Sequence, residues 1–465
     1  MSGTLMVGVS GVRGIVGADL TPELVARYAA AFGVWAGNAN RAPRNAQRRP
    51  AIVVGRDART SGPMFASAAT AGLLSVGCDV IDVGLVPTPT VQLAVEHHRA
   101  AGGLVLTASH NPIEWNALKF VGPDGIFLDS AAGSRVVQLA GDGTLPRVDA
   151  TGVGTVRADD RAVERHLDAV LRLPAVDVRR IRRHRFLVAL DTVRGAGGVV
   201  MPELLRRLGC RVRAANLETD GRFPRAPEPV PEHLGELGRL VKRSKADLGI
   251  AVDPDVDRLA IVDERGVPIG EDYTLAFAVR AVLGGKGGKS RKRVVVCNLS
   301  TSLVVEDAAR DVGAELIRTP VGEVHVARKM IELNARIGGE GNGGVIYPVL
   351  HVGRDAPLAA ALALTLLARE GNTVGELVAA APRYVIVKDK APRGAALAPV
   401  YEGLRRRFPD ASVDTQDGLR LAWVDRWLHV RPSNTEPIVR FIAEAPTRAD
   451  ALSLVEEGRR LCAAS

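Results

Sequence analysis

The sequence predicts an α/β protein with three similar mixed-sheet α/β domains and a C-terminal α+β domain around a central cleft. Three observations support this prediction. The chain has 465 residues, enough for three or four domains of about 100–150 residues each. Strands alternate with helices in a pattern that occurs three times, which is typical of mixed, mostly parallel sheets. The last ~90 residues lack this pattern, which indicates a separate small domain.

The composition limits the kinds of molecule that the protein is expected to bind. The net charge is +9, from 61 basic and 52 acidic residues, but the basic residues are spread along the chain and aromatics make up only 4%. No nucleic-acid-binding module is visible, so no nucleic-acid partner is expected. No apolar run approaches the ~20 residues that a membrane-spanning helix needs, so no membrane segment is predicted. The first residues, Met-Ser-Gly-Thr-Leu-Met, do not resemble a secretory signal.

The cysteines and the basic residues give two further expectations. The four cysteines are scattered without the paired spacing of a zinc site, which indicates reduced thiols and a cytoplasmic location. The densest basic run is Arg179-Arg-Ile-Arg-Arg-His-Arg185. Its simpler interpretation is a solvated linker face, and the alternative is a positive field that draws anionic substrates. The sequence assigns no oligomeric state.

The N-terminal segment from Val7 to Gly17 is rich in glycine and carries one cation, Arg13. Glycines let backbone amides approach an anion, but an irregular loop has the same composition, and both interpretations stay open. Thr21, followed by Pro22 and Glu23, is typical of the start of a helix.

Each of the three repeats contains a strand, a helix, a second strand, a connection and a third strand. In the first repeat the predicted strands are Ala51–Gly55, Asp79–Val83 and Gly103–Thr107, and the predicted helix is Gly62–Val76. The second is predicted at Phe186–Leu190, Val199–Leu208, Arg211–Ala215, a helix ending near Lys245, and Leu248–Val252. In the third repeat the predicted strands are Arg293–Cys297, Glu315–Arg318 and Ile337–Gly339, and the predicted helices are Leu303–Val312 and Val324–Asn334. The C-terminal domain is predicted to contain strands Tyr384–Lys388, Leu421–Val424 and Leu428–Arg431 and a helix from Arg448 to Cys462.

Polar loops follow the last strand of each repeat. They begin at Ser109, Asp253 and Glu340, and they supply a hydroxyl, three carboxylates, and an acid in a glycine-rich turn. Ligands of open α/β sheets collect at the carboxyl ends of strands. Three polar loops at matching points therefore predict one shared cleft.

The second of these loops, Asp253-Pro-Asp-Val-Asp257, places carboxylates at alternate positions. Such a set can converge on one hard cation such as Mg²⁺. The alternative is a polar turn before the strand Leu259–Val262, but carboxylates packed this closely between buried strands are costly unless a cation neutralises them. The glycine and the distant glutamate of an EF-hand are missing. A metal site is the favoured interpretation.

Two further segments are ambiguous by themselves. Arg431-Pro-Ser-Asn-Thr435 offers a guanidinium, hydroxyls and an amide, which suit a phosphate, but a surface turn explains it equally well. Gly55-Arg-Asp-Ala-Arg-Thr-Ser-Gly62 is similar, with Arg56 and Asp57 as a candidate ion pair. No phosphate-binding loop of the GxxxxGK[ST] type is present, which argues against nucleotide hydrolysis.

Taken together, these motifs resemble the α-D-phosphohexomutase family. The resemblance rests on Thr107-Ala-Ser-His-Asn-Pro112, Asp253–Arg258, Gly339-Glu-Gly-Asn-Gly-Gly344 and Arg431-Pro-Ser-Asn-Thr-Glu-Pro437, in the same order and spacing. Ser10-Gly-Val-Arg-Gly14 and Gly55–Gly62 match as well. The resemblance covers nearly the whole chain. It implies four domains around a deep cleft, which we expect at residues 1–153, 154–267, 268–372 and 373–465. These would carry, in order, the catalytic serine, the metal-binding loop, the sugar-binding loop and the phosphate-binding loop.

The resemblance also implies roles for individual residues. Ser109 would be the phosphoserine, and it would bind Mg²⁺ together with Asp253, Asp255 and Asp257. The residues expected to line the catalytic site beside it are His110, Lys119, Arg258 and Arg13. The residues expected to bind the sugar or its distal phosphate are Glu340, Asn342, Arg431, Ser433, Asn434, Thr435 and Arg440.

Two positions depart from the family pattern. Many members have Gly-Glu-x-Ser-Gly-His in the sugar loop, whereas this chain has Asn342 and Gly344 in place of the Ser and His. Ala117 stands where many members have Gly in an Asn-Gly-x-Lys run. Neither change touches the phosphoryl chemistry, but the first bears on the choice of hexose.

The activity implied is interconversion of a hexose 6-phosphate and a hexose 1-phosphate through a phosphoserine, with Mg²⁺ and a hexose 1,6-bisphosphate activator. The sugar loop, followed by Gly353-Arg-Asp355, looks most like that of phosphoglucosamine mutases, so glucosamine phosphates are the expected substrates. Mannose and glucose phosphates are the alternatives. The alternative from another class is a non-catalytic sugar-phosphate-binding protein, which would not need Ser109 together with the aspartates.

Overall fold

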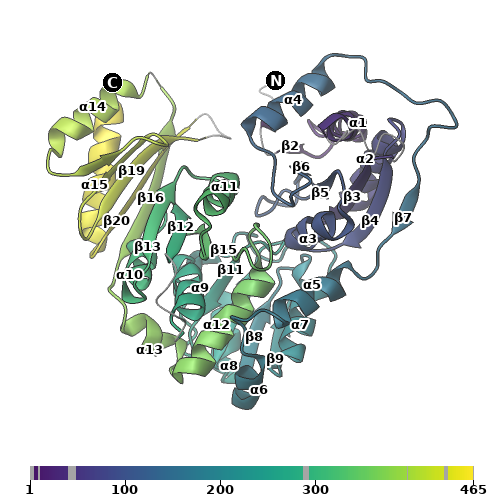
Figure 1. Cartoon of the computed structure of the whole chain (residues 1–465). Coiled ribbons are helices and arrows are strands. Elements are labelled where there is room, and N and C mark those ends of the chain that lie inside the picture. The colour runs from purple at the N-terminus through teal and green to yellow at the C-terminus, as the bar shows by residue number, and fades with distance from the viewer. Residues whose placement is uncertain are drawn as a thin grey trace.

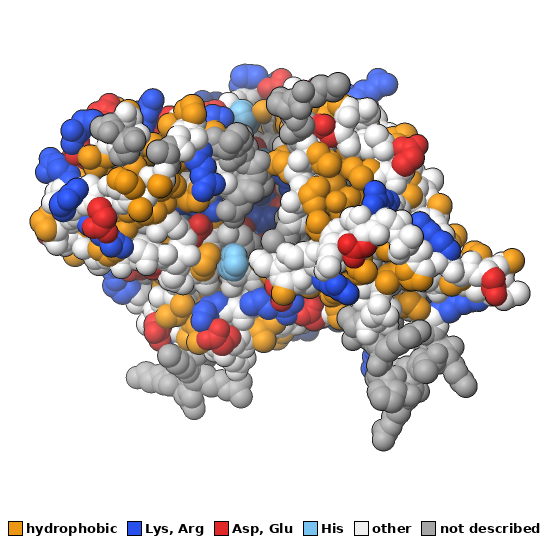
Figure 2. Space-filling model, turned by 90° about the horizontal axis from the view of Figure 1, so that it is seen from above, with side chains coloured by type: hydrophobic (Ala, Val, Ile, Leu, Met, Phe, Trp, Pro, Cys, Tyr) orange, Lys and Arg blue, Asp and Glu red, His pale blue; other side chains and the backbone are white. Residues whose placement is uncertain are grey.

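The computed structural model describes residues 5–8, 11–39, 49–285, 293–394, 396–433 and 438–463. In this part of the chain the strands form four sheets. Figure 1 shows them along an arc, with the first and last sheets at the two upper ends and the second and third between and below them. Seen from above, the surface is hollowed between the two ends, and Lys and Arg side chains are visible inside the hollow (Figure 2). The predicted fold class is confirmed.

The first three sheets share one four-stranded core, which confirms the predicted repeat. If the four strands are numbered along the chain, their order across the sheet is second, first, third and fourth. The first three strands are parallel, and the fourth is antiparallel to the third. In the first core these strands are β3 (Ala51–Arg56), β4 (Asp79–Leu85), β5 (Gly102–Leu106) and β6 (Trp115–Val121). In the second they are β8 (Leu187–Asp191), β9 (Arg211–Ala215), β10 (Leu248–Val252) and β11 (Leu259–Val262). In the third they are β12 (Val294–Asn298), β13 (Glu315–Thr319), β14 (Ile337–Glu340) and β15 (Gly344–Ile346).

The first sheet is extended at both edges. β1 (Met6–Gly8) and β2 (Gly11–Ile15) continue it beyond β6, and β7 (Val156–Ala158) pairs with β4. β7 therefore belongs to the first sheet although it follows residue 153, the expected end of the first domain. The helices of this part are α1 (Pro22–Ala39), α2 (Gly62–Leu74), α3 (Thr88–His98) and α4 (Ser130–Gly141).

The second and third units share the largest hydrophobic cluster of the described residues. At its centre lies α12 (Ala356–Glu370), whose alanine and leucine side chains are buried along almost the whole helix. The side chain of Asp355 caps its first turn by accepting a hydrogen bond from the backbone of Leu358. The other helices of this region are α5 (Ala162–Leu171), α6 (Val178–His184), α7 (Gly197–Arg207), η1 (Pro231–His233), α8 (Gly235–Ser244), α9 (Asp272–Leu283), α10 (Leu303–Asp311), α11 (Glu323–Leu333) and α13 (Val374–Ala379).

The fourth sheet is antiparallel and lacks the repeat, as predicted. Its strand order is β16-β20-β19-β18-β17, and α15 covers it. β20 was not predicted from the sequence, although it lies between two predicted strands of this sheet, β16 and β19. Its elements are β16 (Val385–Pro392), α14 (Ala398–Arg407), β17 (Ser412–Asp414), β18 (Leu419–Ala422), β19 (Trp427–Pro432), β20 (Ile438–Ala445) and α15 (Arg448–Ala463).

The basic run Arg179–Arg185 lies in α6 and its C-terminal cap, Arg185, rather than in a linker, which corrects that interpretation. Asp177 caps the helix, Ile181 is buried, and the basic side chains beside it face solvent. In Figure 1 α6 lies at the bottom of the molecule, on the side away from the hollow. Among the helices that the structure describes, none has the length and apolar character required to span a bilayer.

Candidate active site

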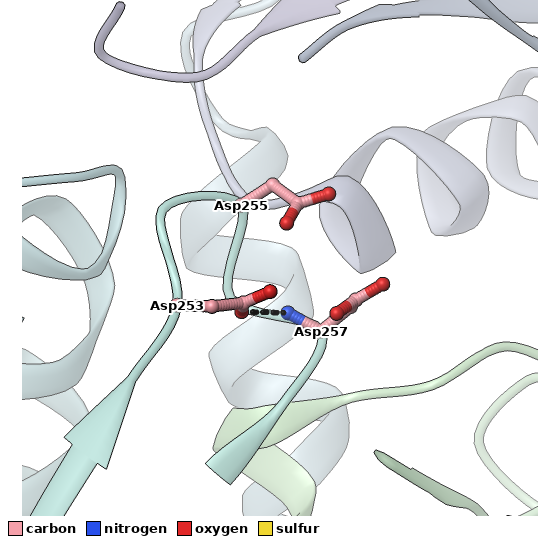
Figure 3. Close-up of side chains that lie close together, drawn as sticks. All are labelled: Asp253, Asp255 and Asp257. Carbon is pink, nitrogen blue, oxygen red and sulfur yellow. Dashed lines mark hydrogen bonds between the residues drawn. The ribbon is translucent and has the colours of Figure 1, made fainter. Parts of the chain in front are cut away.

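The loop between β10 and β11 carries three buried carboxylates that point to the same side (Figure 3). One oxygen from each of Asp253, Asp255 and Asp257 lies within 4.8 Å of the others. Asp253 Oδ1 holds the loop in shape by accepting hydrogen bonds from the backbone amides of Asp257 at 3.1 Å and Arg258 at 3.2 Å. Val256 has a φ of 62°, which turns the chain sharply between the last two aspartates.

These three residues fit a hard cation. Asp255 Oδ1 and Asp257 Oδ1 are buried and have no hydrogen-bond partner among the residues that the structure describes, although buried carboxylate oxygens are normally paired. Burial and the neighbouring charges of Asp257 and Asp255 raise the pKa of Asp253 well above its usual value. A divalent cation would satisfy the unpartnered oxygens and remove this repulsion, and Mg²⁺ prefers oxygen ligands of this kind.

Ser109 lies just beyond β5 and faces this cluster. Its Oγ donates to Asp253 Oδ2 at 3.2 Å and lies 3.4 Å from Nδ1 of His110. Its φ of 49° is in the left-handed region, which is strained for a residue with a side chain. The backbone amide of Ser109 donates to Thr107 Oγ1, and this hydroxyl donates to Asp57 Oδ2 at 2.6 Å. These bonds hold the serine in its unusual conformation.

Arg59 is a supporting residue that the sequence analysis missed. Its side chain is completely buried and donates to the backbone carbonyls of Ser109 and Asn111 at 2.6 and 2.7 Å. It also donates to the carbonyls of Pro112 and Trp115. The prediction of an ion pair between Arg56 and Asp57 is wrong. Asp57 pairs with Arg59 at 3.1 Å, and Arg56 donates to the backbone carbonyl of Asp57 instead. Because Arg59 makes these bonds within the serine loop, it fixes the position of Ser109.

Lys119 and Thr88 bind the middle carboxylate. Lys119 Nζ and Thr88 Oγ1 each donate to Asp255 Oδ2 at 2.8 Å, and the backbone amide of Thr88 donates to the Asp255 carbonyl. Burial by itself would raise the pKa of Asp255, but the ammonium of Lys119 and these hydrogen bonds hold it well below its usual value. The middle aspartate is therefore a carboxylate at neutral pH. Thr88 was not identified from the sequence, because a threonine at a helix start has no distinctive pattern.

Arg258, His110 and Arg13 lie on the same side of the site. Arg258 Nη1 donates to Glu228 Oε1 at 2.8 Å, and His110 Nε2 lies 3.9 Å from the same oxygen. The charge of Arg258, burial and the charge of Arg13 lower the pKa of His110 well below its usual value, so its imidazole is neutral at neutral pH. Arg13 Nη1 donates to Asn111 Oδ1 at 2.7 Å, which joins the N-terminal segment to the serine loop.

Glu340 ends β14, as expected for the sugar loop, and it is buried. Its Oε1 accepts from Asn298 Nδ2 at 2.8 Å and from the Gly322 amide at 3.1 Å. Its Oε2 accepts from Asn342 at 3.4 Å and from Arg354 Nη1 at 2.7 Å. Arg354, which the sequence marks only as part of the run Gly353-Arg-Asp355, also pairs with Asp257 and Glu323.

Of the expected phosphate-binding residues, Arg431, Ser433 and Arg440 are described, whereas Asn434 and Thr435 lie outside the described residues. Arg431 is buried at the end of β19, where it is the register partner of Arg440 on β20. Its Nε donates to Asp417 Oδ2 at 2.8 Å, while its Nη2 has no partner among the described residues. Arg431 therefore has donor capacity left for an anion.

Four family models match the chain in order. They are phosphoglucomutase/phosphomannomutase alpha/beta/alpha domains I, II and III at residues 4–145, 164–266 and 270–384, and the C-terminal domain at residues 384–461. The chain belongs to the phosphoglucomutase/phosphomannomutase family. It is therefore a mutase of the isomerase class, as its motifs led us to expect.

Relatives in this family are similar over nearly their whole length. The chain is 39% identical to "Phosphoglucomutase/phosphomannomutase" of Thermococcus kodakarensis, over 98% of both chains. It is 38% identical to "Probable phosphoglucosamine mutase" of Methanopyrus kandleri, over 97% of this chain and 96% of the relative. Among solved structures, a phosphoglucomutase/phosphomannomutase family protein of Burkholderia thailandensis matches with a TM-score of 0.84 and 26% identity, over 98% of this chain and 97% of that one.

Proposed function

We propose that this mutase interconverts a hexose 6-phosphate and a hexose 1-phosphate through a phosphoserine at Ser109 and a bound hexose 1,6-bisphosphate. The observation that carries the proposal is the 3.2 Å hydrogen bond between Ser109 Oγ and Asp253 Oδ2. It places a candidate nucleophile from the first sheet against the carboxylate cluster of the second. A sugar-phosphate-binding protein without catalysis would not need this pairing.

Asp253, Asp255 and Asp257 would hold Mg²⁺, together with the phosphate on Ser109. When bound, such an ion neutralises the charge that develops on the transferring phosphoryl oxygens. Lys119 holds Asp255 in place, and Arg258 and Arg13 supply fixed positive charge beside the serine loop.

In the forward half of the cycle, a hydroxyl of the bound sugar phosphate attacks the phosphorus on Ser109. A new P–O bond to the sugar forms and the bond to Ser109 Oγ breaks, so that the hydroxyl proton, in net terms, replaces the phosphoryl group on the serine. The bisphosphate then turns over and returns its other phosphoryl group to Ser109 by the reverse exchange. Arg431, Ser433 and Arg440, with Asn434 and Thr435, would hold whichever phosphate lies away from the serine.

We further propose glucosamine 6-phosphate and glucosamine 1-phosphate as the preferred pair, because of the sugar loop and the similarity to the Methanopyrus relative. Glucose and mannose phosphates are the alternatives favoured by the name of the Thermococcus relative. Glu340 would accept hydrogen bonds from ring hydroxyls of any of these hexoses. All four cysteines are free thiols, which supports a cytoplasmic enzyme. Its partners would be small-molecule sugar phosphates.

The test is kcat/KM for the 1-phosphates of glucosamine, mannose and glucose, each with its own 1,6-bisphosphate as activator. A preference of about tenfold corresponds to about 1.4 kcal/mol of transition-state binding. Glucosamine 1-phosphate is expected to be preferred, and a tenfold preference for mannose 1-phosphate would show the hexose assignment to be wrong.

The covalent step has its own test. Peptide mass mapping of active enzyme should place a phosphate of about 80 Da on Ser109. Ser109→Ala should lose activity, while Ser67→Ala, at an exposed serine of α2, should keep it. Phosphate on another residue, or full activity of Ser109→Ala, would exclude the phosphoserine mechanism.

A further inference from the structure

Gly344 lies at the start of β15, in the position where many family members have the histidine of the sugar loop. Its backbone conformation is ordinary for a strand: Gly344 is the register partner of Glu340, and its φ is not positive. Its neighbour Gly343 differs, because a φ of 89° and the nearby carbonyl of Leu259 exclude a side chain there. The backbone conformation at position 344 therefore does not require glycine.

The neighbouring side chain of Arg354 does require it. A Cβ atom at position 344 would lie 2.2 Å from Arg354 Cδ and 2.9 Å from Cγ. Both atoms belong to the aliphatic part of the arginine, and both contacts are shorter than van der Waals packing allows. Arg354 thus fills the volume into which a side chain at position 344 would project.

Arg354 cannot move aside without losing its ion pairs. Nη1 binds Glu340 at 2.7 Å, Nε binds Glu323 at 3.1 Å, and Nη2 binds Asp257. The guanidinium is buried, and although burial by itself would lower its pKa, the three carboxylates raise that pKa well above its usual value. It is a permanent cation that joins the metal loop to the sugar loop.

The backbone around Arg354 is fixed to the same two loops. The amide of Asp355 donates to the Val345 carbonyl at 3.0 Å, and the amide of Ala356 donates to the Val256 carbonyl at 3.2 Å. Asp355 also caps α12, the central helix of the core. The base of the arginine is therefore rigid, and its planar guanidinium donates in fixed directions that a lysine cannot reproduce.

We propose that Arg354 is a positioning residue that takes the place of the sugar-loop histidine. Its guanidinium holds Glu340 and Asp257 in one arrangement, and its aliphatic part makes glycine obligatory at position 344. The effect on sugar binding rests on the function proposed above, because it acts through Glu340. The steric exclusion of a side chain at position 344 by Arg354 does not depend on that function.

The test is a double-mutant cycle with Gly344→His, Arg354→Ala and the two combined. Gly344→His is expected to lower kcat/KM at least tenfold while Arg354 is present. Arg354→Ala should also lower kcat/KM at least tenfold, and should raise both the KM for hexose 1-phosphate and the Mg²⁺ concentration needed for half-maximal activity. Adding Gly344→His to Arg354→Ala should cause no further loss. Arg354→Lys should recover little, and Arg183→Ala, at an exposed arginine of α6, should behave as wild type.

A second cycle measures thermal stability without any substrate, with the milder change Gly344→Ala. This variant should lower Tm by about 4 °C or more in the parent chain and have no such effect in Arg354→Ala. If the losses from the two positions simply add, in activity and in Tm, the proposal is overturned. If instead the stability cycle behaves as expected but no hexose phosphate is turned over, the proposed function fails while the exclusion between the two positions stands.

Discussion

His429 gives this enzyme an acid-sensitive contact between its third and fourth units. It is buried in β19, where its Nε2 donates to the carbonyl of Asp417 at 2.6 Å and its Nδ1 accepts from Ser300 Oγ at 2.9 Å. This pairing suits the neutral imidazole. Burial, with the positive charges of Arg431 and Arg420, lowers its pKa to about 4, although the Asp417 carbonyl offsets part of the shift.

The magnitude follows from linkage. The unfolded chain binds the proton with a pKa of about 6.5, so between about pH 6.5 and 4 it holds more protons at this site than the folded chain does. Stability from His429 is therefore fully present above pH 6.5 and is lost as pH falls toward 4. The loss amounts to about 2 kcal/mol at pH 5 and approaches about 3 kcal/mol below pH 4.

The assay compares unfolding free energies at pH 8 and pH 5 in wild type and His429→Gln, with hydrogen exchange on β19 and β20 to report on the fourth unit. His429→Gln is expected to be less stable at pH 8 but to lose about 2 kcal/mol less than wild type on acidification. His325→Gln, at an exposed histidine of α11, is the matched control and should lose as much as wild type. Equal pH dependence in wild type and His429→Gln would refute the reasoning.

Three further predictions concern supporting residues. Arg59→Met should lower unfolding free energy by about 3–5 kcal/mol in urea titrations, because it leaves a buried carboxylate without its partner. Thr88→Val removes the hydroxyl that donates to Asp255 and should raise the Mg²⁺ concentration for half-maximal activity by about tenfold or more. Gly72→Ala, with its Cβ 2.2 Å from a carbonyl of α1, should cost about 1–3 kcal/mol, whereas Gly141→Ala, with open space around it, should cost nothing.

The sequence was sufficient to predict strands and the metal loop where a local residue pattern determines both structure and chemistry. β10 and β11 begin and end at the residues predicted for them, because each is an apolar run between turn or helix signals. β9 (Arg-Val-Arg-Ala-Ala) also has the predicted bounds, although it is not an apolar run. The triad Asp253, Asp255 and Asp257 was predicted because acids at alternate positions are costly between buried strands. The structure brings them together as expected.

The sequence was insufficient where a role depends on a distant partner. Arg59 was noted only within a motif, and its four carbonyl acceptors lie in the serine loop, about 50 positions along the chain. Arg354 binds Asp257 at a separation of 97 positions. No local pattern marks such residues, because an arginine near a turn has the same signature whether it is exposed or buried. Their functions depend on the folded chain: Arg59 binds the serine loop within the first unit, and Arg354 joins the metal loop of the second unit to the sugar loop of the third.

The arrangement of charge explains why these distant residues are needed. The metal loop belongs to the second unit, while the cations that bind its carboxylates come from both neighbours: Lys119 from the first sheet and Arg354 from the segment after β15. Among the described residues, the buried charged side chains around the metal loop include Asp253, Asp255, Asp257, Glu323 and Glu340, with Lys119, Arg258 and Arg354. Burial and the neighbouring carboxylates of Asp257 and Asp255 raise the pKa of Asp253 well above its usual value, because like charges are costly in a buried region. A divalent cation would relieve this repulsion, which supports the Mg²⁺ proposal. Arg13 lies on the serine side, where a phosphate on Ser109 would bring new negative charge.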